Sequence, residues 1–107
     1  MKEKDIRNQI QDYLRLKGWF VYYNLAGLGS YPGLSDLVAI KNGKVVYIEV
    51  KTPTGKLSAY QQKFRDDVEA HGGEYVVARK VEDVQGLEYL GDGNLILREG
   101  GEWNTSL

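Results

Sequence analysis

The spacing of apolar residues predicts that the chain begins with an amphipathic helix and continues into a strand. Between residues 3 and 17 the apolar positions recur in steps of three and four, the period of a helix with one buried face. These positions are Ile6, Ile10, Tyr13, Leu14 and Leu16. Gly18 then provides a C-cap, and the aromatic, β-rich residues 19–24 predict a strand.

A β-hairpin is predicted next, with strands over residues 35–41 and 44–50. Its two apolar runs flank Asn42-Gly43, a pair that favours a type I′ turn because both central residues of that turn have positive φ. A two-residue turn also fixes which residues face each other across the strands. The predicted pairs are Lys41 with Lys44, Ile40 with Val45, Val38 with Tyr47, and Asp36 with Glu49.

This register brings charged groups together at the open end of the hairpin. Asp36 and Glu49 would lie opposite each other with Cβ atoms about 5 Å apart, where two carboxylates repel. Lys51 would point to the same face as Glu49, because side chains alternate along a strand. A hard divalent cation would relieve the repulsion, since such ions prefer carboxylate oxygens. The alternative is a surface salt-bridge cluster neutralised by Lys51, but the apolar strands around both acids favour a functional site.

A glycine-rich loop and a second helix flank the hairpin. Residues 25–33 hold three glycines and one proline, and they predict a flexible loop that lets a backbone approach the acidic face. Ser58 and Gln61 form a capping-box pattern at the start of the helix, and Gly72-Gly73 ends it. The expected apolar stripe of this helix is Tyr60, Phe64 and Val68.

The remaining segments complete an α/β pattern. Residues 74–78 predict a buried strand and residues 81–90 a short helix. Residues 95–97 follow a turn signal, in a tail that would form either a small hairpin or a partner surface. The order of helix, strand, hairpin, helix and strand predicts one α/β domain over residues 1–107, with a mixed sheet flanked by helices.

Composition restricts the function without identifying it. The formal net charge is -1, so nucleic-acid binding would need a local basic patch. The chain has no cysteine, which excludes disulfides and cysteine-based zinc sites and is typical of a reducing cytosol. Its one histidine, His71, lies near the end of the second helix, where an interaction with the helix dipole is expected. No apolar run reaches the ~20 residues of a membrane span, and we expect a cytoplasmic protein.

Candidate contacts to nucleic acid lie on or near the hairpin and the second helix. Five cations would together form the local phosphate-binding patch that the net charge does not provide. They are Lys41, Lys44, Lys56, Lys63 and Arg65. Tyr31 in the loop is a candidate for stacking on a base. Tyr22 and Tyr23 have the same chemistry, but one or other of them is more simply explained as a half-buried residue of the sheet.

In combination, these residues resemble the VRR-NUC family of the PD-(D/E)xK nuclease superfamily. Asp36 followed by residues 49–51 (EVK) is similar to the D…ExK signature of the superfamily. Residues 33–36 (GLSD) resemble the family's G-x-P-D entry, with Ser35 in place of the usual proline, and residues 57–61 (LSAYQ) resemble its Leu-Ser-x-x-Gln helix start. The resemblance covers residues 3–78 and implies a restriction-endonuclease-like αβββαβ core.

The resemblance also implies a Mg²⁺- or Mn²⁺-dependent deoxyribonuclease that hydrolyses phosphodiester bonds. The metal ligands that it implies are Asp36, Glu49 and the backbone carbonyl of Val50, with Glu3 of the first helix as a further acid. Lys51 would orient the attacking water or stabilise charge on the phosphate. Gln61 would steady Lys51 or the water, a role that is compatible with helix capping.

Partners and alternatives follow from the same resemblance. Small domains of this family are associated with phage and bacteria, and they imply a homodimer that cuts branched DNA such as a Holliday junction in the bacterial or phage-infected cytoplasm. Residues 95–97 and Trp103 are candidates for part of a dimer surface. One alternative is a non-catalytic nucleic-acid-binding module that retains the nuclease fold. Another is a structural or interaction protein whose acids form a surface salt bridge.

Overall fold

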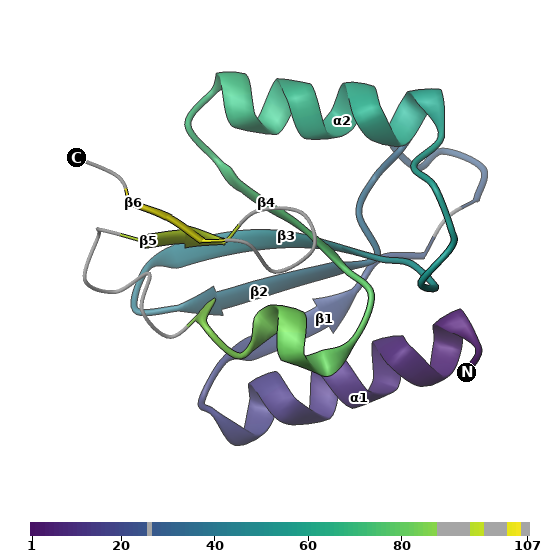
Figure 1. Ribbon diagram of the computed structural model, residues 1–107. Coiled ribbons are helices and arrows are strands. Elements are labelled where there is room, and N and C mark those ends of the chain that lie inside the picture. The colour runs from purple at the N-terminus through teal and green to yellow at the C-terminus, as the bar shows by residue number, and fades with distance from the viewer. Residues whose placement is uncertain (26, 88–94, 98–102, 106–107) are drawn as a thin grey trace.

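The computed structural model describes residues 1–25, 27–87, 95–97 and 103–105. Within these residues a four-stranded sheet lies between two helices, which cover its opposite faces (Figure 1). The elements, in order, are α1 (Glu3–Leu16), β1 (Phe20–Tyr23), β2 (Leu37–Lys41), β3 (Lys44–Val50), α2 (Ala59–Ala70), β4 (Glu74–Ala78), a 3₁₀ helix η1 (Val81–Val84), β5 (Leu95–Leu97) and β6 (Trp103–Thr105). The predicted α/β fold, with helix, three strands, helix and strand, is confirmed.

The strands lie in the order β1-β2-β3-β4, with β1, β2 and β3 antiparallel and β4 parallel to β3. A parallel pair needs a crossover connection, and α2 provides it. Asn42 and Gly43 have φ values of 52° and 79°, as a type I′ turn requires. The predicted hairpin pairs within the ladder are confirmed: Lys41 with Lys44, Ile40 with Val45, and Val38 with Tyr47.

Strand β2 begins at Leu37, two residues later than predicted. The ladder with β3 therefore ends at the pair of Leu37 with Ile48, and Asp36 lies one residue beyond it. At that position the Asp36 carbonyl accepts a 2.8 Å hydrogen bond from the Asn24 N–H, and its carboxylate accepts one from the Val50 N–H. Side-chain bonding to Val50 thus takes the place of backbone pairing where the loop enters the sheet.

The hydrophobic core lies between the sheet and α1. Ile6, Ile10 and Leu14 of α1 are buried there with Trp19, Val84 and Leu87. The sheet contributes the side chains of Val21, Leu37, Ala39, Val46, Ile48, Val50, Val76 and Ala78. Burial of each large apolar side chain stabilises the fold by about 1.5–3 kcal/mol. Leu16, predicted on the same stripe, is 85% exposed because two residues after Leu14 the side chain points to nearly the opposite face of the helix.

The opposite face is covered more loosely by α2, which has no fully buried residue. Phe64 is its anchor, with its ring 5.6 Å from that of Tyr47 and 6.1 Å from that of Tyr75. Tyr60 was predicted on the same apolar stripe, and this prediction is wrong, since Tyr60 is 67% exposed. The first turn of α2 lies against the loop at Gly33 and leaves the Tyr60 side chain outside the sheet contact.

The segments after β4 agree with the sequence in part. The predicted helix over residues 81–90 is a 3₁₀ helix at Val81–Val84, and residues 88–90 lie outside the described part of the chain. Strands β5 and β6 pair antiparallel, which favours the hairpin interpretation of the tail. A dimer surface was proposed at residues 95–97 and Trp103. The structure describes the backbone of these residues but not their side chains. In the described ranges no helix is long and apolar enough to cross a membrane.

Candidate active site

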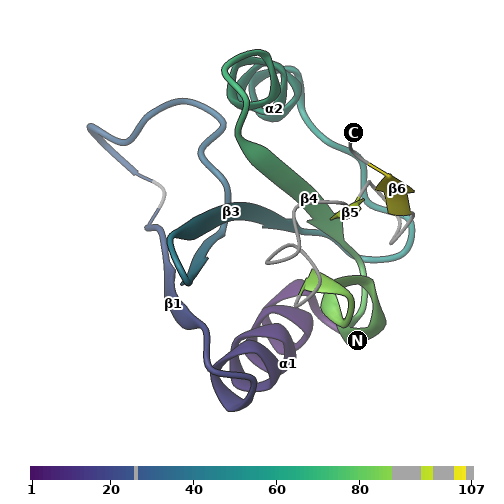
Figure 2. The ribbon, with the colours of Figure 1, turned by 90° about the vertical axis from the view of Figure 1, so that its left-hand side faces the viewer.

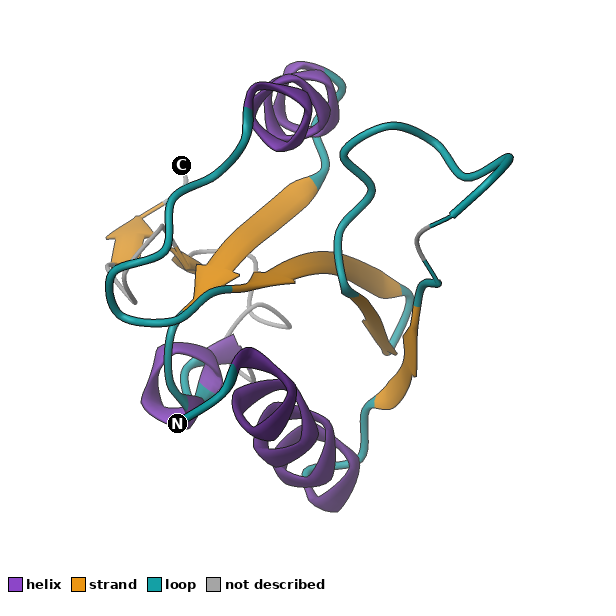
Figure 3. Cartoon of the chain, turned by 90° about the vertical axis from the view of Figure 1, so that its right-hand side faces the viewer, coloured by secondary structure: helices purple, strands orange, loops and turns teal. Residues whose placement is uncertain are grey.

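The charged residues predicted to act together lie at the end of the sheet where β3 stops. Figure 3 looks onto this end, with α1 on one face of the sheet, α2 on the other, and the loop from β3 to α2 running between the two levels. The loop from β1 to β2 rises past the edge of the sheet towards α2 (Figure 2).

The structure brings Asp36 and Glu49 together at the end of β3, close enough for the charge of Asp36 to raise the pKa of Glu49. Asp36 Oδ2 accepts a 2.8 Å hydrogen bond from the Val50 N–H, which fixes its orientation towards β3. Glu49 is 1% exposed, although it is an acid in a strand of a small protein. Buried acids are rare unless they are paired, so this geometry excludes the interpretation of Glu49 as part of a solvated surface salt bridge.

The surroundings of Glu49 disfavour its ionised form. Burial raises the pKa of Glu49, and the neighbouring Asp36 carboxylate raises it further, to about 8. The Lys51 ammonium lowers this pKa, and Glu3 raises it. One oxygen, Oε1, is buried without a hydrogen-bond partner in the described structure. The protonated form of Glu49 is therefore favoured unless a cation joins the site.

Lys51 and Gln61 both reach the other carboxylate oxygen, Oε2 of Glu49. The Lys51 ammonium lies 3.7 Å from it, and its side chain is 13% exposed. The Gln61 Nε2 atom donates a 3.0 Å hydrogen bond to it. We expected Gln61 to contact Lys51 or a water, whereas its partner is Glu49 itself. The crossover connection after β3 places the start of α2 beside the end of that strand, and Gln61 there contacts Glu49.

Gln61 also caps the helix that carries it. Its Oε1 atom accepts a 2.9 Å hydrogen bond from the Ser58 N–H, and its own N–H donates a 3.2 Å hydrogen bond to Ser58 Oγ. The predicted capping box is therefore present. The amide oxygen of Gln61 bonds to Ser58 and its amide nitrogen bonds to Glu49, so the residue caps the helix and contacts the acid at the same time.

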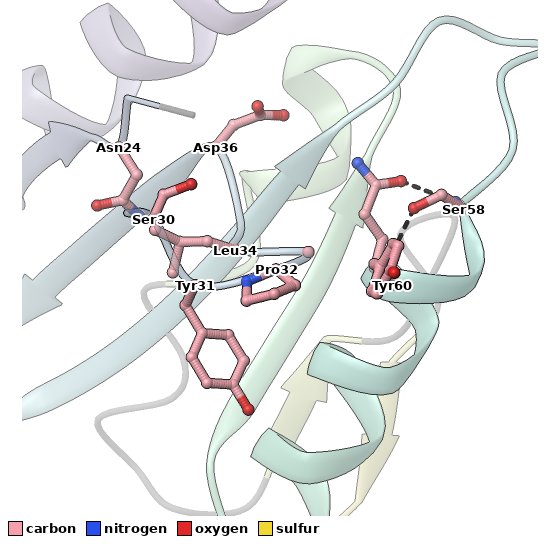
Figure 4. Close-up of a pocket in the computed structure, with 10 residues that line it drawn as sticks. Asn24, Ser30, Tyr31, Pro32, Leu34, Asp36, Ser58 and Tyr60 are labelled. Carbon is pink, nitrogen blue, oxygen red and sulfur yellow. Dashed lines mark hydrogen bonds between the residues drawn. The ribbon is translucent and has the colours of Figure 1, made fainter. Parts of the chain in front are cut away.

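Gly33 holds the glycine-rich loop against α2. Its φ is +76°, and a Cβ atom on it would lie 2.1 Å from the carbonyl oxygen of Tyr60. This contact requires glycine for both space and backbone conformation. A pocket of about 240 Å³ lies between the loop and the helix start and borders Asp36 (Figure 4). The residues that line it are Asn24, Ser30, Tyr31, Pro32, Gly33, Leu34, Asp36, Ser58, Tyr60 and Gln61.

Sequence reasoning missed Asn24 and Tyr60 as neighbours of the site. Asn24 was assigned to the end of a strand and Tyr60 to a buried stripe, and both line the pocket. A usable signal for Tyr60 was its position between the capping residues Ser58 and Gln61, which face the loop. Tyr31 also lines the pocket, and its ring lies 5.9 Å from that of Phe64. Tyr22 and Tyr23 are 42% and 50% exposed, as half-buried sheet residues.

Two of the predicted phosphate-binding cations lie at the far end of the hairpin from the acids. Lys41 and Lys44 flank the hairpin turn, and the five residue steps from Lys44 to Glu49 span about 17 Å of strand. The Lys41 ammonium donates a 2.7 Å hydrogen bond to the Lys17 carbonyl there. The turn and the open end of a hairpin are opposite ends, so Lys41 and Lys44 lie apart from the acids.

The two predicted cations on α2, Lys63 and Arg65, have acidic neighbours on the same helix. Lys63 forms a 2.8 Å ion pair with Asp67, which raises the pKa of Lys63, and Arg65 lies 3.3 Å from Asp66. A second pocket of about 260 Å³ is lined by Lys56, Leu57, Gln62, Arg65 and Arg79. Arg79, which the sequence analysis did not single out, donates hydrogen bonds to the carbonyls of Thr52 and Gly55.

His71 lies at the C-terminal end of α2, with its Nδ1 atom 2.7 Å from the Asp67 carbonyl oxygen. It is the C-cap residue of the helix, which agrees with the expected interaction at the helix end. The acids lie at the other end of α2, where Gln61 reaches Glu49. The structure therefore places His71 away from the candidate site.

The donor set fits a hard divalent cation. Two carboxylates converge, and the buried Glu49 Oε1 is an unused acceptor. Among the residues that the structure describes, no three side chains of His, Cys, Asp or Glu are grouped to hold a metal. Mg²⁺ binds through one or two carboxylates and takes its remaining ligands from water and substrate phosphate, so Asp36 and Glu49 alone could hold it.

Comparisons with known proteins find a matching family model and a similar fold. The family model of the VRR-NUC domain matches residues 4–82 of this chain. A solved structure described as a VRR_NUC domain superposes with a TM-score of 0.69 at 20% sequence identity, and the match covers 80% of this chain and 92% of that chain. At this identity the likeness shows the fold. Among curated proteins, no sequence matches this chain.

Proposed function

Because this chain belongs to the VRR-NUC family of nuclease domains, we propose that it is a divalent-metal-dependent endonuclease that hydrolyses DNA phosphodiester bonds. The observation that carries the proposal is the burial of Glu49 beside Asp36, with Oε1 unsatisfied and the pKa of Glu49 raised to about 8. A fold selected for stability alone would not retain a buried, poorly satisfied acid pair. A cation between the two carboxylates gives the arrangement a use.

Asp36, Glu49 and the backbone carbonyl of Val50 are the residues that would hold the cation, Mg²⁺ or Mn²⁺. Glu3 would assist with a second ion, since it lies in the first turn of α1 and close enough to raise the pKa of Glu49. The chemistry supplied by a bound cation is polarisation of the scissile phosphate and a lower pKa of a bound water. Asp36 stays oriented for this task through its hydrogen bond from the Val50 N–H.

Lys51 and Gln61 complete the site on the side of α2. The Lys51 ammonium would stabilise charge that develops on the phosphate or orient the attacking water. Its 13% exposure keeps it shielded from bulk solvent, where an ammonium acts less strongly. Gln61 fixes Oε2 of Glu49 and so acts through the carboxylate. It is a positioning residue in this mechanism.

We further propose branched DNA, such as a Holliday junction, as the substrate and a homodimer as the active form. A two-fold dimer would present two sites and cut two strands symmetrically. Lys56, Lys63 and Arg65 would contact phosphates near the site, and Lys41 and Lys44 would contact DNA that extends to the hairpin turn. The competing function is a nucleic-acid-binding module without catalysis, which the retention of Asp36, Glu49 and Lys51 disfavours.

The test is cleavage of plasmid, linear duplex and four-way junction DNA with Mg²⁺, Mn²⁺ or EDTA. We expect metal-dependent cutting by the wild type and none by Asp36→Ala or Lys51→Ala. Lys17→Ala is the matched control, because Lys17 is an exposed lysine at the C-cap of α1. Cutting that survives in both site variants would show that the site is elsewhere. DNA binding without cutting of any substrate would support the binding module.

A further inference from the structure

The pocket between the glycine-rich loop and α2 has the character of a site for a neutral, planar group. Its lining contains no lysine or arginine, and Asp36 contributes a carboxylate at its border. A phosphate placed there would be repelled without compensation. The lining instead combines apolar surfaces with hydroxyl and amide groups, which suit a ligand with flat faces and hydrogen-bonding edges.

Two exposed side chains form apolar walls of this pocket. In Figure 4, Pro32 lies on one side and the Tyr60 ring on the other, with Asp36 towards the upper edge. Tyr60 is 67% exposed in the first turn of α2, whereas Phe64, one turn later, packs on Tyr47 and Tyr75. The Tyr60 ring therefore presents a flat apolar surface to solvent without contributing to the core.

The polar groups of the pocket are held in place before any ligand arrives. The Asn24 amide nitrogen donates a 2.9 Å hydrogen bond to the Ser35 carbonyl. Ser30 Oγ donates to the Gly27 carbonyl at 2.8 Å and accepts from the Gly27 N–H at 3.1 Å. Side chains fixed in this way lose little conformational freedom when they bind, which favours affinity.

We propose that this pocket binds an unpaired nucleobase, stacked on Tyr60, from a nucleotide next to the scissile phosphate. The inference rests on the proposed nuclease function for its placement, because Asp36 and Gln61 border both the pocket and the acid pair. A phosphate held at the acids brings its neighbouring base to the pocket. A base inside a duplex is paired and stacked on both sides, and it must leave the stack to enter. The pocket thus selects DNA with unpaired bases at the cut, independent of sequence.

The direct test is binding of a short single-stranded oligonucleotide that carries the fluorescent base 2-aminopurine. The background is Lys51→Ala with Mg²⁺, so that the oligonucleotide stays intact. Stacking on Tyr60 is expected to quench the fluorescence, and Tyr60→Ala is expected to weaken binding by roughly 5- to 150-fold, the range for loss of one base–aromatic stack. Tyr60→Phe keeps the ring and is expected to bind as the background protein does.

The matched control is Tyr23→Ala, which removes a tyrosine of similar exposure from β1, where its ring packs against Arg7. Equal binding by Tyr60→Ala and Tyr60→Phe would overturn the inference. So would an equal loss in Tyr23→Ala, because that loss would not depend on the pocket.

Cleavage assays separate this inference from the proposed function. A duplex with one unpaired base at the cut is expected to be cleaved faster than the fully paired duplex, and Tyr60→Ala is expected to remove the difference. A cleavage rate that depends neither on the unpaired base nor on Tyr60 would overturn the pocket assignment without contradicting the proposed nuclease activity. Tyr60-dependent quenching in a protein that cuts no DNA would overturn the nuclease and assign the pocket to a binding module.

Discussion

One side chain, Gln61, joins the start of α2 to the buried acid of β3: its Nε2 atom donates a 3.0 Å hydrogen bond to Glu49 Oε2, and its Oε1 atom accepts a 2.9 Å bond from the Ser58 N–H. The capping box fixes the amide, and the fixed amide orients the carboxylate. Local helix chemistry therefore determines the geometry of a residue 12 positions earlier in the chain.

Replacing Gln61 is expected to affect stability and cleavage together. Gln61→Ala removes one half of the capping box, at a cost of about 1 kcal/mol in the free energy of unfolding. It also frees Glu49 Oε2, and loss of such a supporting contact lowers metal affinity or activity by about 10- to 100-fold. Urea denaturation and a Mg²⁺ titration of cleavage measure the two effects. Gln62→Ala is the control, because Gln62 bonds to the Leu57 carbonyl and does not reach Glu49. An equal loss of cleavage in both variants would contradict the positioning role.

The stability of the metal-free protein is expected to fall as pH rises from about 4.5 to about 8. Glu49 keeps its proton up to about pH 8 in the folded state, while in the unfolded state it loses it near its ordinary value of 4.5. The native state then binds more protons than the unfolded state, so the free energy of unfolding decreases with pH across this window. The total change is of the order of 2–4 kcal/mol. Urea denaturation in EDTA at both ends of the window measures it.

Two variants of that experiment test its cause. Glu49→Gln retains the shape of the side chain but cannot ionise. The part of the pH dependence that comes from Glu49 should therefore be absent from the stability of this variant. Mg²⁺ favours the ionised carboxylate and is expected to stabilise the wild type more at the upper end of the window than at the lower end. A wild-type slope that persists in Glu49→Gln would assign the effect to another group.

The sequence was sufficient for the hairpin and for the encounter of the two acids. Asn42 and Gly43 specify the turn, and a strand repeat of two residues then determines every pair as far as Leu37 and Ile48. Extrapolation by one residue beyond the ladder placed Asp36 beside Glu49, although a side-chain bond to Val50 makes the contact in place of strand pairing. These are short-range relationships, which local rules can reach.

Relationships across long loops were beyond those rules. Helical periodicity predicts that Tyr60 and Phe64 lie on the same face of α2. It does not show that the first turn of the helix contacts the loop at Gly33, whereas the next turn, with Phe64, contacts the sheet. The contact of Gln61 with Glu49 likewise depends on the position that the connection from β3 to β4 gives to α2. Lys41 and Lys44 flank the turn, so the hairpin separates them from the acids at its open end.

Lys51 is expected to be required for cleavage. Lys51→Met keeps the length of the side chain beside Gly55 but removes the ammonium, and loss of one stabilising group at the reacting phosphate lowers the rate by about 10²- to 10³-fold. Because the ammonium lowers the pKa of Glu49, the same variant should also shift the fall in stability to higher pH. Single-turnover cleavage and the urea series measure the two effects. Lys17→Met is the control, and a rate unchanged in Lys51→Met would remove Lys51 from the mechanism.

Gly33→Ala is expected to detach the glycine-rich loop from α2. A Cβ atom at this position would lie 2.1 Å from the Tyr60 carbonyl oxygen and 2.8 Å from the Gln61 backbone nitrogen, so the loop or the helix start must move. Gly43→Ala is a control with nearly the same backbone, because Gly43 has φ of +79° and nothing within 4 Å of its Cβ position. Both variants bear the strain of a positive φ, about 1–2 kcal/mol, and only Gly33→Ala bears the clash.

The difference between the two variants therefore isolates the contact between the loop and α2. Urea denaturation should show a larger loss of stability for Gly33→Ala than for Gly43→Ala, and DNA cleavage should fall only in Gly33→Ala. The reason for the second effect is that a shifted helix start moves Gln61 away from Glu49 and opens the pocket at Tyr60. Equal stability and equal cleavage in the two variants would mean that the loop contributes nothing to the site beyond its own turn.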